Sequence, residues 1–272
     1  MDSRLYLLLT LACYALGALQ VVVHMLTRQR PLGHSTVTAT LLGFALHTAE
    51  LSLRWNEAGR FPLLGLHDAT SLLAWVTVLA FLATYLRTRV DALGLVVYPT
   101  AFALVLISAA TPAVAGGPRA LHGALLPVHA SLAFLGYAAL FVAFAMGILY
   151  LLQERELKSR APRGLSHVIP SLERCDTFSG RSVAVGFGFL TLAMATGTQV
   201  NAAVYGRLWT WDPKEVSALV AWVLYVVLLV ARWRAGWGGR RAAYLGIAAF
   251  LLVVSVFFYV SVLGVPQAGP PR

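Results

Sequence analysis

Eight apolar runs, each long enough to cross a lipid bilayer, occupy almost the whole chain. A helix needs roughly 20 apolar residues to span the ~30 Å hydrocarbon core of a membrane. Only 12% of the residues are charged and 59% are hydrophobic, whereas about a quarter of the residues of a soluble domain are charged. The runs cover residues 3–26, 36–55, 66–87, 92–110, 123–152, 182–203, 214–233 and 241–264. The sequence therefore predicts an all-α polytopic membrane protein, in which residues 1–272 form one integral membrane domain and one helix bundle in the lipid bilayer.

The distribution of positive charge predicts how the chain is oriented in the membrane. Fourteen of the 21 Lys and Arg residues lie in the first, third, fifth and seventh connections or at the ends of the runs that flank them. By the positive-inside rule these connections face the cytoplasm, and both termini are extracytoplasmic. The same bias explains the formal net charge of +10 as attraction to an anionic leaflet. The sequence has no basic stripe interleaved with aromatic residues, so we expect no nucleic acid among the partners.

The Trp-rich segment at residues 208–215 mixes aromatic and charged side chains between two apolar runs. Asp212 is biased away from helix by the following proline, and Pro213 suits the first turn of a helix. The segment should therefore end in a helix N-terminus, whose free N–H groups attract anions. With two indoles and a lysine beside it, such an end can hold a flat, partly anionic ligand. The candidate binding residues are Trp209, Trp211, Asp212 and Lys214. The alternative is an interfacial aromatic belt with one fixed charge.

Histidines are the next candidates for chemistry. His47 lies inside the second run, where an ionisable side chain marks either a functional site or a hydrogen bond between helices. His129 lies at the outer end of the fifth run, and His122 precedes it by about two turns. A neutral imidazole at this position can ligate iron, although a lone histidine at a membrane interface is more often solvated or hydrogen-bonded. His67, next to Asp68, is an intermediate case.

Several classes of protein are excluded by missing motifs. The two cysteines, Cys13 and Cys175, form no Cys-x-x-Cys pair, which argues against a thiol relay and against a covalently haem-bearing c-type cytochrome. The chain also lacks the Walker, Gly-x-Ser-x-Gly and His-Glu-x-x-His sequences of common enzyme classes. A small-molecule transporter would show an internal repeat or interrupted spans, and the sequence has no persuasive repeat.

The Trp-rich segment resembles a known family. Residues 205–215, Tyr-Gly-Arg-Leu-Trp-Thr-Trp-Asp-Pro-Lys-Glu, are similar to the "WWD" segment of the cytochrome c assembly family, the haem-handling proteins of the CcsA, ResC and CcmC type. Further similarity to the CcsA branch is found at residues 46–48, 53–55, 59–63, 128–132, 136–139 and 236–244. The resemblance extends from about residue 41 to residue 250, and it defines a haem-handling cytochrome c assembly domain.

The resemblance implies a haem chaperone that acts in cytochrome c maturation as a subunit of a System II synthase. In such proteins haem b is held non-covalently and transiently at the outer face, in the Trp-rich loop, for attachment to apocytochrome c. His129 then matches the first outer axial ligand, and His47 matches a histidine that holds haem within the membrane. The implied partners are a membrane subunit of the CcsB or ResB type, apocytochrome c and a thiol-reducing protein. The implied location is the bacterial cytoplasmic membrane, with the Trp-rich loop outside.

The chain departs from the family pattern at two positions. It has no histidine after His167, whereas the family places a second outer histidine after the last span and another near the end of the seventh. The sequence therefore does not identify the second iron ligand. The alternatives are that His122 or His67 supplies it, that a partner supplies it, that the iron has a single ligand, or that haem handling has been lost. No residue suggests itself as a catalytic acid or base, so any lyase activity would depend on partners. The alternative from another class is a HemX-like membrane regulator or scaffold linked to haem biosynthesis.

Overall fold

Eight long α-helices make up most of the protein. The computed structural model describes residues 2–27, 34–59, 65–113, 125–159 and 169–263, and within these ranges it contains helices but no strand. The helices are α1 (Ser3–Leu26), α2 (His34–Ala58), α3 (Gly65–Thr88), α4 (Gly94–Ala110), α5 (Leu125–Lys158), α6 (Leu172–Tyr205), α7 (Pro213–Arg234) and α8 (Gly239–Leu263), with a short 3-10 helix, η1 (Asp91–Leu93), before α4. The prediction of an all-α polytopic bundle is confirmed.

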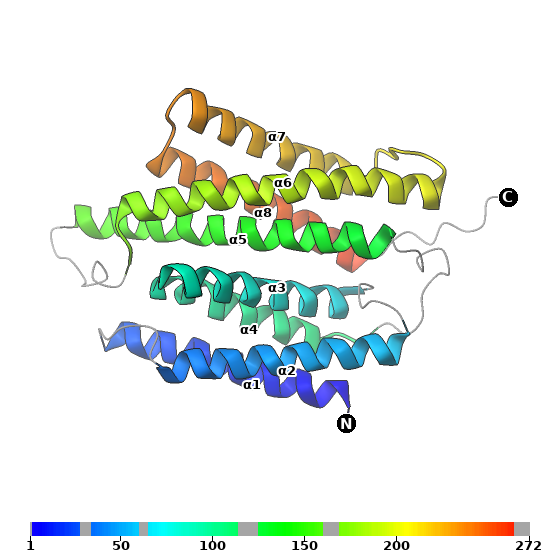
Figure 1. Cartoon of the computed structure of the whole chain (residues 1–272), viewed down its shortest axis with the longest axis horizontal. Helices are drawn as coiled ribbons and strands as arrows, with labels where there is room; N and C mark the ends of the chain where they lie inside the picture. The colour runs from blue at the N-terminus through cyan, green and yellow to red at the C-terminus, as the bar shows by residue number, and fades with distance from the viewer. Residues whose placement is uncertain (1, 28–33, 60–64, 114–124, 160–168, 264–272) are drawn as a thin grey trace.

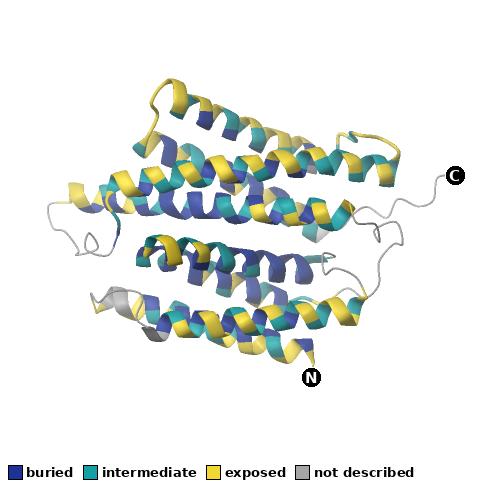
Figure 2. Ribbon diagram, in the orientation of Figure 1, coloured by how far each residue is buried: buried dark blue, intermediate teal, exposed yellow. Residues whose placement is uncertain are grey.

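The helices run along one common direction and form a layered bundle (Figure 1). Helices α1 and α2 form one edge and α7 the opposite edge, while α3, α4 and α5 lie between them. The buried side chains concentrate on this middle layer, as the dark blue ribbon shows (Figure 2). Because successive helices alternate in direction, α1 begins at the same end of the bundle at which α6 stops and α7 begins. We call this end the Trp-loop end.

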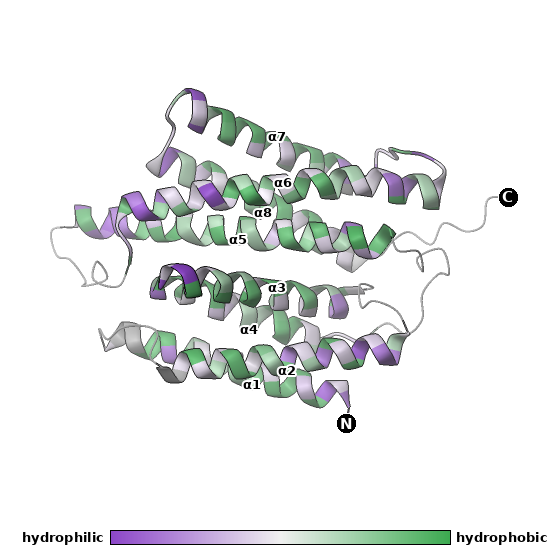
Figure 3. Ribbon diagram, viewed as in Figure 1, coloured by the Kyte–Doolittle hydropathy of each residue, from purple (hydrophilic) through white to green (hydrophobic). Residues whose placement is uncertain are grey.

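The outer surface of the bundle is apolar along the middle of the helices (Figure 3). Large aliphatic side chains such as Leu16, Leu19 and Val230 are exposed there, an arrangement that suits lipid and not water. Among the described residues, seven helices are long and apolar enough to cross a membrane. The chain is therefore a multi-pass membrane protein. Which side of the membrane holds the Trp-loop end stays a prediction from charge.

Helix α2 is not among these seven, because its polarity is directed inward. The buried residues that the structure describes on α2 are Thr36, Thr40, Gly43, His47 and Glu50. Four of them are polar, and the fifth is a glycine. The spacing of four, three, four and three residues places them on one face of the helix. Its lipid-facing side carries exposed leucines at positions 41 and 42. The membrane span predicted at residues 36–55 is thus not among the helices that length and composition support as spans, and α2 packs against α1.

The start of α6 differs from the expected boundary. The sixth apolar run covers residues 182–203, but α6 begins ten residues earlier, at Leu172. Ser171 caps the helix, because its side chain accepts a hydrogen bond from the backbone N–H of Arg174, and Glu173 favours the first turn. The expectation was wrong by about ten residues because the apolar run, and not the cap, was used to place the start of the helix.

Helices α5 and α6 cross closely through glycine. A Cβ atom on Gly186 would lie 2.6 Å from the side chain of Leu140, and one on Gly136 would lie 3.3 Å from the backbone nitrogen of Leu190. Small residues let two membrane helices approach in this way. Gly186 thus serves helix packing, whereas a Cβ atom on Gly188 would meet nothing within 4 Å. This close contact fixes the position of α6, which carries one side of the candidate site.

Candidate functional site

The Trp loop, residues 206–212, connects α6 to α7 at one end of the bundle. Helix α6 stops at Gly206, which adopts the left-handed conformation with φ 68°. Helix α7 begins at Pro213, as the Asp-Pro sequence predicted. The carbonyl oxygen of Asp212 accepts hydrogen bonds from the N–H groups of Glu215 and Val216, at 2.9 and 3.2 Å. The loop therefore leads directly into a helix N-terminus, the kind of end that favours negatively charged ligand groups.

Glu215 holds the Trp loop in its conformation. Its carboxylate accepts hydrogen bonds from the backbone N–H groups of Thr210 and Trp211 at 2.8 and 2.9 Å. It also accepts from the Thr210 hydroxyl at 2.7 Å and from the Asn201 side-chain amide at 2.6 Å. The sequence analysis missed this residue as a functional one. Its position in the sequence could have indicated this role. Glu215 is the third residue of α7, and a glutamate at this position commonly accepts hydrogen bonds from N–H groups just before the helix.

Of the two indoles of the loop, one is exposed and the other has a buried N–H group without a hydrogen-bond partner. Trp211 is 75% exposed and has a positive φ of 59°, a conformation in which a bulky residue is uncommon. Trp209 packs edge to face against it, with ring centroids 6.0 Å apart. The Nε1 atom of Trp209 is buried and has no hydrogen-bond partner among the described residues. An exposed ring and an unpaired buried donor are features that a bound ligand would satisfy. The side chain of Lys214 lies outside the described part of the structure.

His129 has one nitrogen fixed by the protein and one nitrogen free. Its Nδ1 lies 2.8 Å from the carbonyl oxygen of Ala193 and 3.4 Å from the hydroxyl of Thr196, both on α6. A carbonyl oxygen only accepts, so Nδ1 carries the proton and a neutral ring has its lone pair on Nε2. Within the described residues Nε2 has no hydrogen-bond partner. A histidine that binds a metal is oriented by the same type of bond from its other nitrogen.

His129 and the Trp loop are joined through α6. Gly197 faces the imidazole, since a Cβ atom there would lie 3.0 Å from Cε1 of His129. One turn further along α6, about 6 Å, Asn201 donates to Glu215, the residue that holds the Trp loop. One face of one helix therefore supports both the imidazole and the loop. The structure thus places His129 and the Trp loop at the same end of the bundle, along one face of α6.

His47 is fully buried and both of its ring nitrogens are occupied. Nδ1 lies 3.3 Å from the hydroxyl of Tyr14 on α1, and Nε2 lies 3.0 Å from the hydroxyl of Ser71 on α3. Ser71 in turn donates to the carboxylate of Glu50 at 3.0 Å, so its oxygen accepts from Nε2–H of His47 and Tyr14 donates to Nδ1. Iron ligation by His47 would require one of these bonds to open. The structure thus places His47 in a hydrogen-bonded network of α1, α2 and α3, away from the Trp loop.

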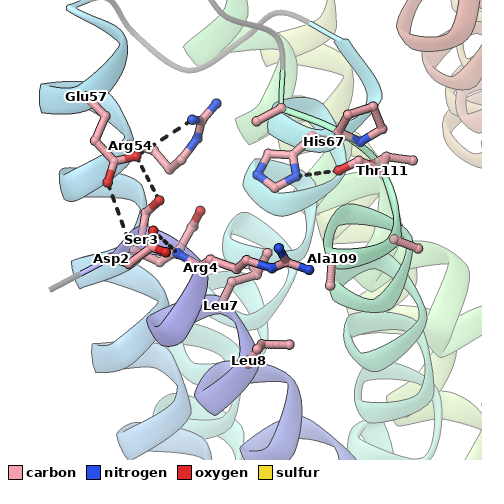
Figure 4. A pocket seen from close by; sticks show the side chains of 14 residues that line it. Asp2, Ser3, Arg4, Leu7, Leu8, Arg54, Glu57, His67, Ala109 and Thr111 are labelled. Atoms are coloured by element: carbon pink, nitrogen blue, oxygen red, sulfur yellow. Dashed lines mark hydrogen bonds and ion pairs between the residues drawn. The ribbon is translucent and has the colours of Figure 1, made fainter.

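His67 and His122, the alternative ligands, differ in what the structure describes. Nδ1 of His67 faces two backbone carbonyl oxygens, those of Ser108 at 2.8 Å and Thr111 at 3.2 Å. The ring lines a pocket formed by residues of α1 to α4 (Figure 4). His122 lies outside the described residues. The described residues hold no group of three or more His, Cys, Asp or Glu side chains that could bind a bare metal ion.

Comparisons with known proteins agree with the resemblance in the Trp-rich segment. Residues 63–265 match the model of the family described as "Cytochrome C assembly protein". A "Cytochrome c biogenesis protein CcsA" of Guillardia theta is 31% identical over 252 residues, which cover 83% of this chain and 82% of the relative. Proteins with the same name from Prochlorococcus marinus (strain MIT 9303) and Synechococcus sp. (strain CC9605) are 29% and 30% identical. These two matches cover 85% and 81% of the chain, and 83% and 81% of the relatives.

Proposed function

Since the chain belongs to the cytochrome c assembly protein family, we propose that it serves cytochrome c maturation by binding haem b at the Trp-loop end of the bundle. It would present this haem for covalent attachment to apocytochrome c. Relatives named for cytochrome c biogenesis support the general role. The specific role in haem binding is our inference from the residues of the site.

The free Nε2 atom of His129 is the observation that carries this proposal. Its Nδ1–H is held by the Ala193 carbonyl oxygen at 2.8 Å, which fixes the ring orientation and leaves the lone pair on Nε2 available to a ligand. Imidazole is a common axial ligand of haem iron.

The Trp loop fits the flat and anionic parts of haem. The exposed Trp211 ring offers a stacking surface and the Nε1–H group of Trp209 lacks an acceptor, so a porphyrin face and a propionate oxygen match them. Asp212 and Lys214 lie on either side of Pro213, the first residue of α7, and the helix N-terminus favours propionate charge. When bound, haem supplies the porphyrin edge to which the thiols of apocytochrome c become attached. The residues of this chain bind and orient it, and they offer no catalytic acid or base.

The remaining parts of the proposal concern partners and location. Covalent attachment would need a membrane subunit of the CcsB or ResB type and a protein that keeps the apocytochrome thiols reduced. The Trp loop would face outward from a bacterial cytoplasmic membrane, as the positive-inside rule predicts. His47 would hold haem only during transit, because Tyr14 or Ser71 must first release a ring nitrogen.

Absorption spectroscopy of the purified protein tests the proposal. We expect the wild-type protein, prepared from cells with ample haem and its partner subunit, to show a b-type spectrum that reduction sharpens. His129→Ala should lose or shift that spectrum and block c-type cytochrome maturation. Thr196→Val, which removes only the weaker contact to Nδ1, should retain both. A haem-free wild-type protein would contradict the proposal and favour the HemX-like regulatory function, which the absence of histidines after His167 also suits.

A further inference from the structure

A groove lies between α6, α7 and the connection from α7 to α8. It is at the end of the bundle opposite the Trp loop, where α6 begins and α7 stops (Figure 1). Its volume is about 430 Å³, within the range of sites for small ligands. The positive-inside rule predicts that this end faces the cytoplasm. The groove is lined neither by His129 nor by the Trp loop, so the function proposed above makes no use of it.

Asp176 of α6 holds the walls of the groove together. Its carboxylate accepts a hydrogen bond from the N–H group of Gly239, the first residue of α8, at 2.9 Å. It also forms an ion pair with Nη2 of Arg232 on α7 at 3.0 Å, and the same nitrogen donates to the Asp176 carbonyl oxygen at 2.9 Å. The guanidinium packs on Gly180, where a Cβ atom would lie only 2.7 Å from Nη2. Contacts within the protein therefore fix the shape of the groove.

The groove has an excess of positive charge. Asp176 is the one carboxylate among the described residues that line it, and Arg232 balances its charge. Both contacts of Arg232 use Nη2, so within the described residues the N–H groups of Nη1 and Nε are left for another acceptor. Arg181 of α6 also lines the groove; it is exposed and has no ion pair or hydrogen bond in the described part of the chain. Two guanidinium groups with free donors suit a phosphate group.

The lining changes from polar to apolar toward the middle of the bundle. Ala184 of α6 and Leu229 of α7 line the groove about one helical turn deeper than the two arginines. Beside them, Val185 and Val230 are exposed on the apolar surface of the bundle. Trp237 lines the polar end, and indoles of this kind are typical of the boundary between membrane and water. A ligand that fills the groove therefore has a charged part at this boundary and an apolar part among the lipid chains.

We propose that this groove binds an anionic phospholipid, with Arg181 and Arg232 at the phosphate and an acyl chain along Ala184 and Leu229. Basic pockets between membrane helices on the cytoplasmic side bind headgroups of this type. A soluble phosphate would leave the apolar end of the groove unused. A phosphatidylcholine headgroup would bring its own positive charge close to the arginines. The proposal is independent of haem binding at the Trp-loop end.

Native mass spectrometry of the purified full-length protein, titrated in detergent with phosphatidylglycerol, tests this inference. Phosphatidylcholine with the same acyl chains is the reference lipid. We expect Arg181→Gln to weaken phosphatidylglycerol binding about tenfold, as for the loss of one charge-assisted hydrogen bond, and to leave phosphatidylcholine binding unchanged. Arg234→Gln is the matched control, because Arg234 is also exposed and unpaired among the described residues but does not line the groove. Its effect should stay below about twofold.

A second variant tests the apolar end of the groove. Ala184→Phe should fill this end and weaken phosphatidylglycerol binding, whereas Val185→Phe, at the next exposed position outside the lining, should not. Equal weakening by Arg181→Gln and Arg234→Gln, or equal affinity of the wild-type protein for the two lipids, would overturn the site. Displacement of phosphatidylglycerol by inorganic phosphate, together with normal lipid binding by Ala184→Phe, would show a site for a soluble anion and overturn the lipid assignment.

Discussion

His47 and His129 are both histidines of membrane helices, yet their surroundings are opposite. His47 is fully buried and has a hydrogen bond at each ring nitrogen, from Tyr14 and to Ser71. His129 is partly exposed, and only Nδ1 is held, by a backbone carbonyl oxygen. Burial alone would favour His47 as the functional residue. Under the proposed function, free hydrogen-bonding capacity, and not burial, is the property that marks an intramembrane histidine as a ligand.

The same contrast extends to the regions around the two residues. On the buried face of α2, Ser71 of α3 connects His47 to Glu50, and Thr40 pairs with the hydroxyl of Tyr98 on α4. The Trp loop instead leaves the Trp209 N–H group unpaired and exposes the Trp211 ring. We therefore expect substitutions in the first region to lower the free energy of unfolding. Those in the second region should remove haem and cost little stability.

The largest effect should come from Glu215→Ala, which affects both properties. The carboxylate accepts four hydrogen bonds that hold the Trp loop, and their loss should cost about 3 kcal/mol and abolish haem retention. Glu173→Ala, an exposed acidic residue in the first turn of α6, is the control. Thermal unfolding and haem content measure the two effects. Normal haem content in Glu215→Ala would show that the loop conformation does not matter for binding.

Ser71→Ala should lower stability and leave haem at His129 unchanged. The substitution removes the hydroxyl between Nε2 of His47 and the Glu50 carboxylate, and unpaired buried groups of this kind should cost about 2 kcal/mol. Ser52→Ala, an exposed serine of α2, should have no measurable effect. If Ser71→Ala lost haem without a loss of thermal stability, the proposed division between a stabilising region and a haem-binding region would be wrong.

Trp211→Ala should lose haem with almost no change in the free energy of unfolding, because the ring is already exposed. Trp233 on α7 is exposed to the same degree, 76% against 75%, and Trp233→Ala is therefore the matched control. Haem content after purification, normalised to protein, separates the two variants. Equal haem content in both would support an interfacial aromatic belt in place of a haem-binding loop.

Gly197→Ala should have the smallest effect, a partial loss of haem affinity of about fivefold, or roughly 1 kcal/mol. The new methyl group would lie 3.0 Å from Cε1 of His129 and tilt the imidazole away from its carbonyl acceptor. Gly188→Ala, on the same helix but with no atom within 4 Å of the new methyl group, should bind haem normally. Haem titration measures the difference in affinity. Equal affinities would mean that haem binding does not depend on the orientation of the His129 imidazole.

Much of the fold could be predicted from the sequence, because membrane spans are encoded locally. Apolar runs located all eight helices, and the Asp-Pro sequence located the start of α7 at Pro213. The start of α6 was misplaced because the cap at Ser171 lies well before the apolar run. Local patterns thus reveal where a helix crosses the membrane more reliably than where it begins.

The state of each histidine could not be predicted, because it depends on atoms far away in the chain. His129 meets a carbonyl oxygen 64 residues later, and His67 meets one 41 residues later. No sequence pattern signals which helix turn will face an imidazole. The role of Glu215 was accessible in principle, since its partners Thr210 and Trp211 are only five and four residues away.

The most direct test of the account is chemical rescue of His129→Gly. Removal of the imidazole leaves space beside Gly197, and free imidazole added to the purified variant can occupy it and supply the missing nitrogen. We expect the variant to lose its haem spectrum and to recover a b-type spectrum when haem and imidazole are added together. If haem binds equally well with and without imidazole, or if imidazole has no effect on a folded variant that has lost haem, His129 is not the iron ligand.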